Sequence, residues 1–227
     1  REAADSGAKI LNMSFGKPVS PGKEVVWDAF KYAESKGVLL VKAAGNENEN
    51  IAENVYYPTN FKNVEDAKPF INNMIVVGAS TNDNDFLRAS FSNYNQKMVN
   101  VFAPGDKIYS TVPDGKYEYL QGTSMASPVV AGAASVLLAY MPNLTPAQMI
   151  EALVKTSNKS SVNAMINSNT NNRFDLISEA GGVIDLKKAA EYAYTHFYKP
   201  SAITIPSKST PSKSKKKVIP KKAVTRK

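Results

Sequence analysis

The residues best suited to chemistry form one run, which reads Gln121-Gly122-Thr123-Ser124-Met125-Ala126-Ser127-Pro128. It leads into the most apolar helical pattern of the sequence, at residues 129–140, and Pro128 is expected in the first helical turn, where a missing N–H group costs little. The free N–H groups and dipole of a helix start favour negative charge. We therefore predict that the Ser124 hydroxyl attacks a carbonyl carbon, whose oxyanion would find donors nearby. The alternative is an ordinary buried helix with a Ser or Thr cap.

Strand and helix patterns alternate around this run. Nearly continuous apolar stretches, expected for parallel strands covered on both faces, occur at residues 8–16, 38–44, 74–79 and 98–105. Helical spacing occurs at residues 22–36, 145–155 and 186–197, a hairpin is expected at 107–120, and an exposed loop at 157–172. This order predicts an α/β fold built from βαβ units.

Two further segments lie where parallel sheets bind ligands, at the carboxyl ends of predicted strands. The first strand ends with Asn12-Met13-Ser14-Phe15-Gly16, and the second with Ala43-Ala44-Gly45-Asn46. Taken singly, the first segment could be a plain core strand and Asn46 a common turn residue.

Taken together, these two segments and the serine run resemble, in this order, three motifs of the subtilisin-like serine proteases, peptidase family S8. Shorter matches at 75–79, 89–92, 103–105 and 182–185 extend the resemblance over most of residues 8–195. The resemblance implies a three-layer α/β fold with a mostly parallel central sheet. It also implies a serine endopeptidase, a hydrolase that cleaves polypeptides through an acyl-enzyme.

The resemblance assigns roles to the matched positions. Ser124 would form the acyl-enzyme, and the side-chain amide of Asn46 would stabilise the oxyanion together with the Ser124 N–H group. An extended substrate would pair with the strand that ends at Gly16. The primary specificity pocket, walled in part by Tyr57-Pro58, is expected to accept a fairly large apolar side chain. The substrate-binding residues implied are Ser14, Phe15, Gly16, Ala43, Ala44, Gly45, Pro58 and Thr123.

A general base is not evident. The single histidine, His196, follows Ser124, whereas the subtilisin order is Asp, His, Ser. We expect His196 to be an exposed helix-end residue. The residues before Asn12 resemble neither the Asp nor the His motif of the family.

We therefore expect residues 1–199 to be the carboxyl-terminal part of a subtilisin-like catalytic domain whose amino-terminal part is missing. That part would be a partner of this chain, which alone would be inactive or nearly so. The alternative is a non-catalytic pseudoprotease that binds peptides.

The positive charge is concentrated at the end of the sequence. The formal net charge is +8, yet nine of the 28 basic side chains and none of the 20 acidic ones lie from Ser201 onward. Residues 200–227 are therefore predicted to be a disordered tail rich in Lys, Ser and Pro. No aromatic residue interleaves with its lysines, so we expect a solubilising or anchoring role, with polyanion binding as the alternative and nucleic acid not expected.

The remaining composition sets further expectations. No run of eighteen apolar residues is evident, so no transmembrane helix is expected. The absence of cysteine excludes disulfides and thiolate metal sites. Calcium is common in the resembled family, but no Asp-rich loop has clear ligand spacing, so no metal or cofactor is assigned. By family, the protein would be secreted or periplasmic, although the first residues carry no signal-peptide pattern.

Overall fold

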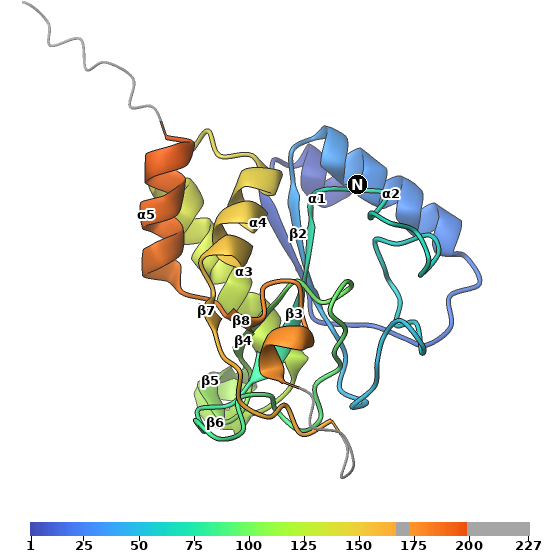
Figure 1. Cartoon of the computed structure of the whole chain (residues 1–227). Coiled ribbons are helices and arrows are strands. Elements are labelled where there is room, and N and C mark those ends of the chain that lie inside the picture. Colours follow the sequence, from blue (N-terminus) through green and yellow to red (C-terminus); the bar gives the residue numbers. More distant parts are fainter. Residues whose placement is uncertain (167–172, 199–227) are drawn as a thin grey trace, which may run out of the picture.

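A computed structural model describes residues 1–166 and 173–198. Its centre is a six-stranded sheet in the order β1-β2-β3-β4-β8-β7 (Figure 1). The sheet is parallel except at β7, which pairs antiparallel with β8. The prediction of an α/β fold with a mostly parallel sheet is therefore confirmed. The strands are β1 Ile10–Met13, β2 Leu39–Ala43, β3 Met74–Ser80, β4 Val101–Pro104, β7 Asn158–Lys159 and β8 Gly182–Val183.

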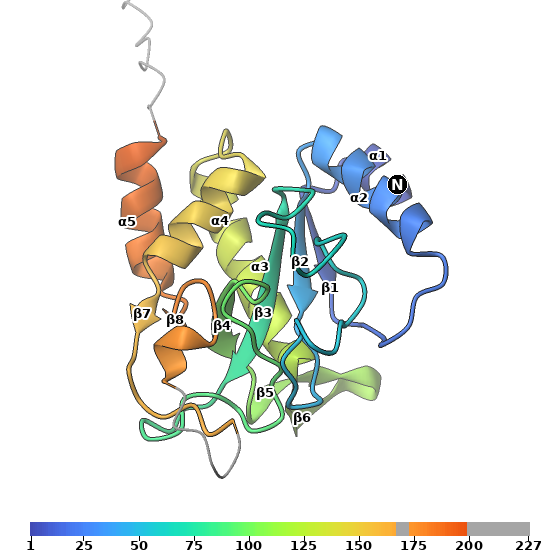
Figure 2. The ribbon, with the colours of Figure 1, turned by 45° about the vertical axis from the view of Figure 1, so that its right-hand side comes forward.

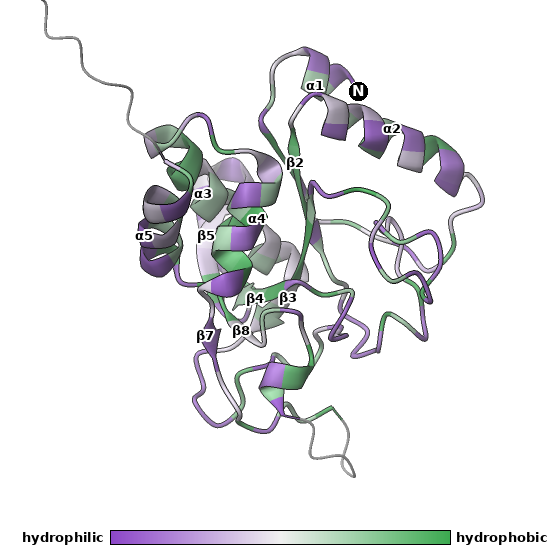
Figure 3. Ribbon diagram, turned by 45° about the horizontal axis from the view of Figure 1, so that its top comes forward, coloured by the Kyte–Doolittle hydropathy of each residue, from purple (hydrophilic) through white to green (hydrophobic). Residues whose placement is uncertain are grey.

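Helices cover both faces of this sheet (Figures 1 and 2). On one side lie α1 (Glu2–Asp5) and α2 (Lys23–Ser35), and on the other α3 (Thr123–Tyr140), α4 (Pro146–Lys155) and α5 (Leu186–His196). Side chains alternate between the two cores: Leu39 and Val41 pack with α3, whereas Leu40 packs with α2 residues such as Phe30. Burial on both faces explains why the central strands are mostly hydrophobic, with Lys42 of β2 as an exception (Figure 3).

The hairpin is confirmed: β5 (Ile108–Val112) pairs antiparallel with β6 (Lys116–Leu120) around a short 3₁₀ turn at Pro113–Gly115. Thr145 and Gln148 form a capping box at the start of α4, which agrees with the predicted helix start. The exposed loop predicted at 157–172 is wrong in part, because Ala164 and Ile166 are buried and Arg88 donates to the Ala164 carbonyl oxygen. Residues 167–172 lie outside the described part, and a second 3₁₀ turn spans Phe174–Leu176.

Helix α3 differs from its prediction at its start. It begins at Thr123, so Pro128 lies in the helix interior rather than in its first turn. Among the described residues, α3 is the one helix that is long and apolar enough to cross a membrane, by length and composition only. The expectation of no transmembrane helix stays a prediction. Here α3 packs against β1, β2, β3 and β4, which accounts for its apolar character as that of a core helix.

The predicted tail, residues 200–227, lies outside the described part of the chain. The domain boundary near residue 199 therefore stays a prediction.

Lys42 is a charged side chain inside the α2-side core. Its side chain on β2 is 1% exposed, and its Nζ donates to the Tyr56 carbonyl oxygen at 3.2 Å. Burial lowers the pKa of Lys42 from 10.5 to about 7, and the negative charge of Glu47 opposes this shift. In the folded protein the ammonium group is therefore destabilised relative to the unfolded chain.

We predict that Lys42→Met stabilises the protein at and below pH 7 by roughly 1–4 kcal/mol, as replacement of buried ions by apolar groups does. Between pH 7 and 10.5 the unfolded wild-type chain binds the Lys42 proton and the folded chain does not. The free energy of unfolding of the wild type should therefore gain up to about 1.4 kcal/mol per pH unit from this group, and the variant should lose that gain. Urea denaturation of both proteins at pH 6 to 10 measures the difference, and equal pH slopes would contradict it.

Candidate active site

The three motifs meet at the carboxyl ends of β1 and β2 and at the start of α3 (Figure 2). Ser14 follows the last residue of β1, and Ser124 is the second residue of α3. The two serines exchange hydrogen bonds: Ser14 Oγ donates to the Ser124 carbonyl oxygen at 2.8 Å, and Ser124 Oγ donates to the Ser14 carbonyl oxygen at 3.2 Å. This pair of bonds fixes the candidate nucleophile to the tip of β1.

Pro128 explains why the Ser124 carbonyl oxygen is available. In an α-helix this oxygen would accept from the N–H group of residue 128, which proline lacks. The Ser14 hydroxyl supplies the missing donor. Ser14 is itself oriented by Asn12, whose Nδ2 donates to Ser14 Oγ at 2.9 Å, and Ser127 Oγ donates to Asn12 Oδ1 at 2.7 Å. The proline within α3 thus replaces a helical bond with a side-chain network to β1.

Thr123 fixes the orientation of the Asn46 side chain. Asn46 Oδ1 accepts from the Thr123 N–H group at 2.8 Å and from Thr123 Oγ1 at 3.0 Å. The Thr123 hydroxyl also accepts from the Gly45 N–H group at 3.1 Å. With its oxygen occupied, Asn46 presents the Nδ2 donor on the other side of the amide, and no residue in the described ranges accepts from it.

Two free donors converge at Gly122. A methyl group on Gly122 would lie 3.5 Å from Asn46 Nδ2 and 3.6 Å from the Ser124 nitrogen. The Ser124 N–H group is in the first turn of α3, where no helical acceptor exists, and no acceptor for it occurs in the described part of the chain. The space beside Gly122 therefore lies next to two N–H donors, and the Ser124 residue that supplies one of them is half-buried.

The edge beyond Ser14 can accept an extended peptide. Within the described residues, the backbone N–H and C=O groups of Phe15 and Gly16 form no hydrogen bond with the protein. Phe15 is 64% exposed. Lys17, the residue after Gly16, pairs with Tyr57 through two backbone hydrogen bonds. Residues 15 and 16 thus form a short free strand edge next to the serine.

The predicted wall at Ala43, Ala44 and Gly45 is buried and already bonded. The Ala44 and Gly45 carbonyl oxygens accept from Asn93 at 3.2 and 3.0 Å. Asn93 Oδ1 also accepts from the Glu47 and Glu49 N–H groups. The sequence prediction missed Asn93, although it directly follows the matched run at 89–92.

The primary pocket expected between these walls is not open. Pro58 lines a cavity of about 350 Å³ with Phe15, Gly16 and Tyr57, but this cavity extends toward Val26 of α2. The space between Gly16 and Gly45 holds the ring of Tyr56. The ring of Tyr56, a residue that the motif match did not cover, therefore lies where that pocket was expected. The size of the substrate side chain that the site accepts stays a prediction.

His196 takes no part in this site. Its Nδ1 contacts the Tyr192 carbonyl oxygen at 2.9 Å, and its ring stacks on Tyr192 at the exposed end of α5. Among the described residues, neither a histidine nor a carboxylate contacts the Ser124 side chain. The Ser124 hydroxyl therefore has no base beside it in this part of the molecule.

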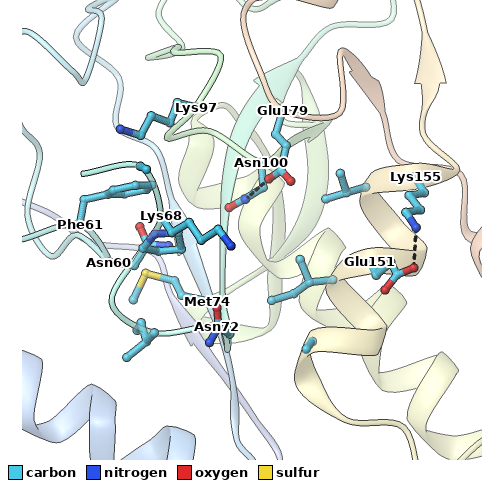
Figure 4. Close-up of a pocket in the computed structure, with 16 residues that line it drawn as sticks. Asn60, Phe61, Lys68, Asn72, Met74, Lys97, Asn100, Glu151, Lys155 and Glu179 are labelled. Carbon is cyan, nitrogen blue, oxygen red and sulfur yellow. Dashed lines mark hydrogen bonds and ion pairs between the residues drawn. The ribbon is translucent and has the colours of Figure 1, made fainter. Parts of the chain in front are cut away.

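A cavity of about 550 Å³ lies at the opposite, amino-terminal end of the strands (Figure 4). It is bordered by Met74 at the start of β3 and by polar groups that pair with one another. Lys155 binds Glu151 at 2.7 Å, and Asn100 binds Glu179 at 2.6 Å. This cavity lies away from the serine. Lys68 and Lys97 also line it, and its residues indicate no particular reaction. Within the described ranges, no three His, Asp or Glu side chains group as metal ligands.

A model of the subtilase family matches residues 1–179. The chain therefore belongs to the subtilase family, the subtilisin-like serine proteases, and the prediction from the three motifs is confirmed.

Individual proteins that are similar to this chain are also subtilisin-like proteases or share its fold. The chain is 37% identical to subtilisin DY of Bacillus licheniformis over 156 residues, which cover 68% of this chain and 52% of that protein. It is 43% identical to thermitase of Thermoactinomyces vulgaris, over 60% of this chain and 42% of that protein. This chain thus spans about half the length of these relatives. Among solved structures, the patellamide maturation protease PatA matches its fold with a TM-score of 0.65 and 23% identity, over 86% of this chain and 66% of that one.

We predict that Gly122→Ala destabilises the protein by about 1–3 kcal/mol, the usual cost of a backbone region open only to glycine. Gly122 has φ 147° and ψ 160°, while its neighbouring atoms leave room for a methyl group. Gly132→Ala in the same helix is the matched control. Nothing lies within 4 Å of its added methyl group, so it should stabilise by about 0.5–1 kcal/mol. Urea denaturation compares the two, and equal stabilities would contradict the prediction.

Proposed function

We propose that this chain is part of a subtilisin-type serine endopeptidase in which Ser124 attacks the substrate carbonyl and forms the acyl-enzyme. The oxyanion accepts from Asn46 Nδ2 and from the Ser124 N–H group. The observation that carries the proposal is that these two donors lie within 3.6 Å of the same point beside Gly122, one of them the N–H group of the candidate nucleophile itself.

The polypeptide substrate pairs with the free backbone groups of Phe15 and Gly16, as an added strand does. This places the substrate on the strand whose preceding residue, Ser14, is bonded to Ser124. Substrate and nucleophile are therefore held by the same segment. The other proposed substrate-binding residues adjoin this segment: Ala43 ends β2, Thr123 begins α3, and Ala44, Gly45 and Pro58 lie in the loop between β2 and β3.

We further propose that the general base comes from residues that precede Arg1 in the coding sequence. Two surfaces support this. Within the described residues, β1 pairs with β2 only, which leaves its other edge open. The outer face of α3 exposes Pro128, Gly132 and Val136, and Val136 is 41% exposed. A segment that covers this edge and this face would approach Ser124. Without it, loss of the base would lower turnover by about 10⁶.

The second candidate is a pseudoprotease that binds peptides without cleaving them. It is favoured by the same observation that no base contacts Ser124 among the described residues. A secreted or periplasmic location is implied by the family in either case and stays a prediction, and no calcium site is assigned.

Labelling with a fluorophosphonate probe tests the proposal. The protein, expressed with all residues that precede Arg1 in its coding sequence, should be labelled at Ser124, and Ser124→Ala should abolish the label. The 227-residue chain alone should label far more slowly. Peptide binding by an unlabelled longer protein would instead establish the pseudoprotease.

Substitution of Asn46 separates its donor role from its structural role. In the longer protein, Asn46→Ala should lower kcat about 10²–10³-fold with little change in KM, because an oxyanion donor acts in the transition state. Asn46→Asp keeps an oxygen for the two bonds from Thr123 but lacks the donor, so it should lose at least as much. Asn82→Ala, in an exposed turn, is the control. Recovery of activity in Asn46→Asp would refute the donor role.

A further inference from the structure

The side chain of Tyr56 is inserted between the two strand ends beside the candidate nucleophile. A methyl group on Gly16, beyond β1, would lie 2.2 Å from Tyr56 Cε1 and 2.7 Å from Cδ1. A methyl group on Gly45, beyond β2, would lie 3.1 Å from the same Cδ1 atom. One edge of the ring therefore fills the gap between the segments that end the two strands.

The ring is held in this position from several sides. Lys42 Nζ donates to the Tyr56 carbonyl oxygen at 3.2 Å and lies 5.2 Å from the ring centroid. The following residue, Tyr57, is pinned by its backbone pair with Lys17. Burial raises the pKa of the Tyr56 phenol, and the charge and hydrogen bond of Glu47 raise it further, so the phenol stays neutral. A rotation of the ring out of the gap would have to break this packing.

The two neighbouring cavities do not provide another pocket between Gly16 and Gly45. The cavity of about 350 Å³ that Gly16 lines is bordered by neither Gly45 nor Ser124. A second cavity, of about 600 Å³, lies among Glu47, Glu49, Glu53 and Tyr57, and Tyr56 forms part of its wall. Neither cavity is bordered by Gly45, so neither extends across the space between Gly16 and Gly45.

We infer that Tyr56 determines specificity by closing this space, so that the residue whose carbonyl is attacked must be Gly, Ala or Ser. A Leu or Phe side chain at that position would have to displace the ring. The inference rests on the proposed function for its reaction, but the steric restriction applies to peptide binding as well as to cleavage.

Peptides that differ only at the attacked residue test this in the longer protein. The wild type should cleave the Ala peptide with a kcat/KM about 10–100-fold above that of the Phe peptide, the range expected for a poorly fitting apolar group. Tyr56→Ala should raise kcat/KM for the Phe peptide relative to that for the Ala peptide by about the same factor. Tyr56→Phe keeps the ring and should keep the wild-type preference. Tyr140→Ala, 78% exposed at the end of α3, is the size-matched control.

The outcomes separate the two proposals. Preference of the wild type for Phe or Leu, with Ser124 labelled by fluorophosphonate, would overturn the role of Tyr56 and leave the protease proposal intact. Absence of labelling would overturn the protease proposal. Binding of the uncleaved peptides, measured by calorimetry, would then still decide, because Phe should bind more weakly than Ala only if the ring closes the space. If Tyr56→Ala does not fold, the preference of the wild type between the Ala and Phe peptides supports or overturns the role of Tyr56 by itself.

Discussion

The site depends on the two hydrogen bonds that Ser14 and Ser124 exchange across 110 residues of sequence. They join the end of a strand, where an extended substrate can bind, to the start of a helix, where free N–H groups face outward. Neither segment contains both features. Ser14 both bonds to Ser124 and directly precedes the free edge at Phe15 and Gly16. A shift of β1 relative to α3 would therefore move the substrate away from the nucleophile.

Pro128 makes this junction specific. A proline inside a helix ordinarily costs about 3 kcal/mol or more, in part because an acceptor is left without its donor. Here the orphaned acceptor is the Ser124 carbonyl oxygen, and Ser14 satisfies it. The penalty is reduced only when β1 and α3 are in register. The proline thus favours one docking of the helix on the sheet, which a helix with all its internal bonds would not do.

The sequence predicted the central strands, α2, α4, α5 and the hairpin, because their burial pattern and caps are local properties. It placed the three motifs at one sheet edge because parallel strands end together. It did not predict that α3 begins as early as Thr123, because a proline is expected in the first turn of a helix and Pro128 lies in its interior. Nor did it predict Asn93, whose bonds reach residues 44–49 positions away, or Tyr56, which lies in a loop without regular spacing.

Tyr56 also explains why a charged residue persists in the core. Lys42 occupies a buried position of β2 at which an apolar side chain would be expected, and burial disfavours its ammonium form. Its contacts, however, go to the carbonyl oxygen and ring face of Tyr56, the residue that fills the gap beside the serine. The loop from β2 to β3 has no helix or strand of its own to fix it. Lys42 reaches this loop from β2 and holds the conformation of Tyr56 against the sheet. The same side chain therefore lowers the stability of the core and orders the loop beside the serine.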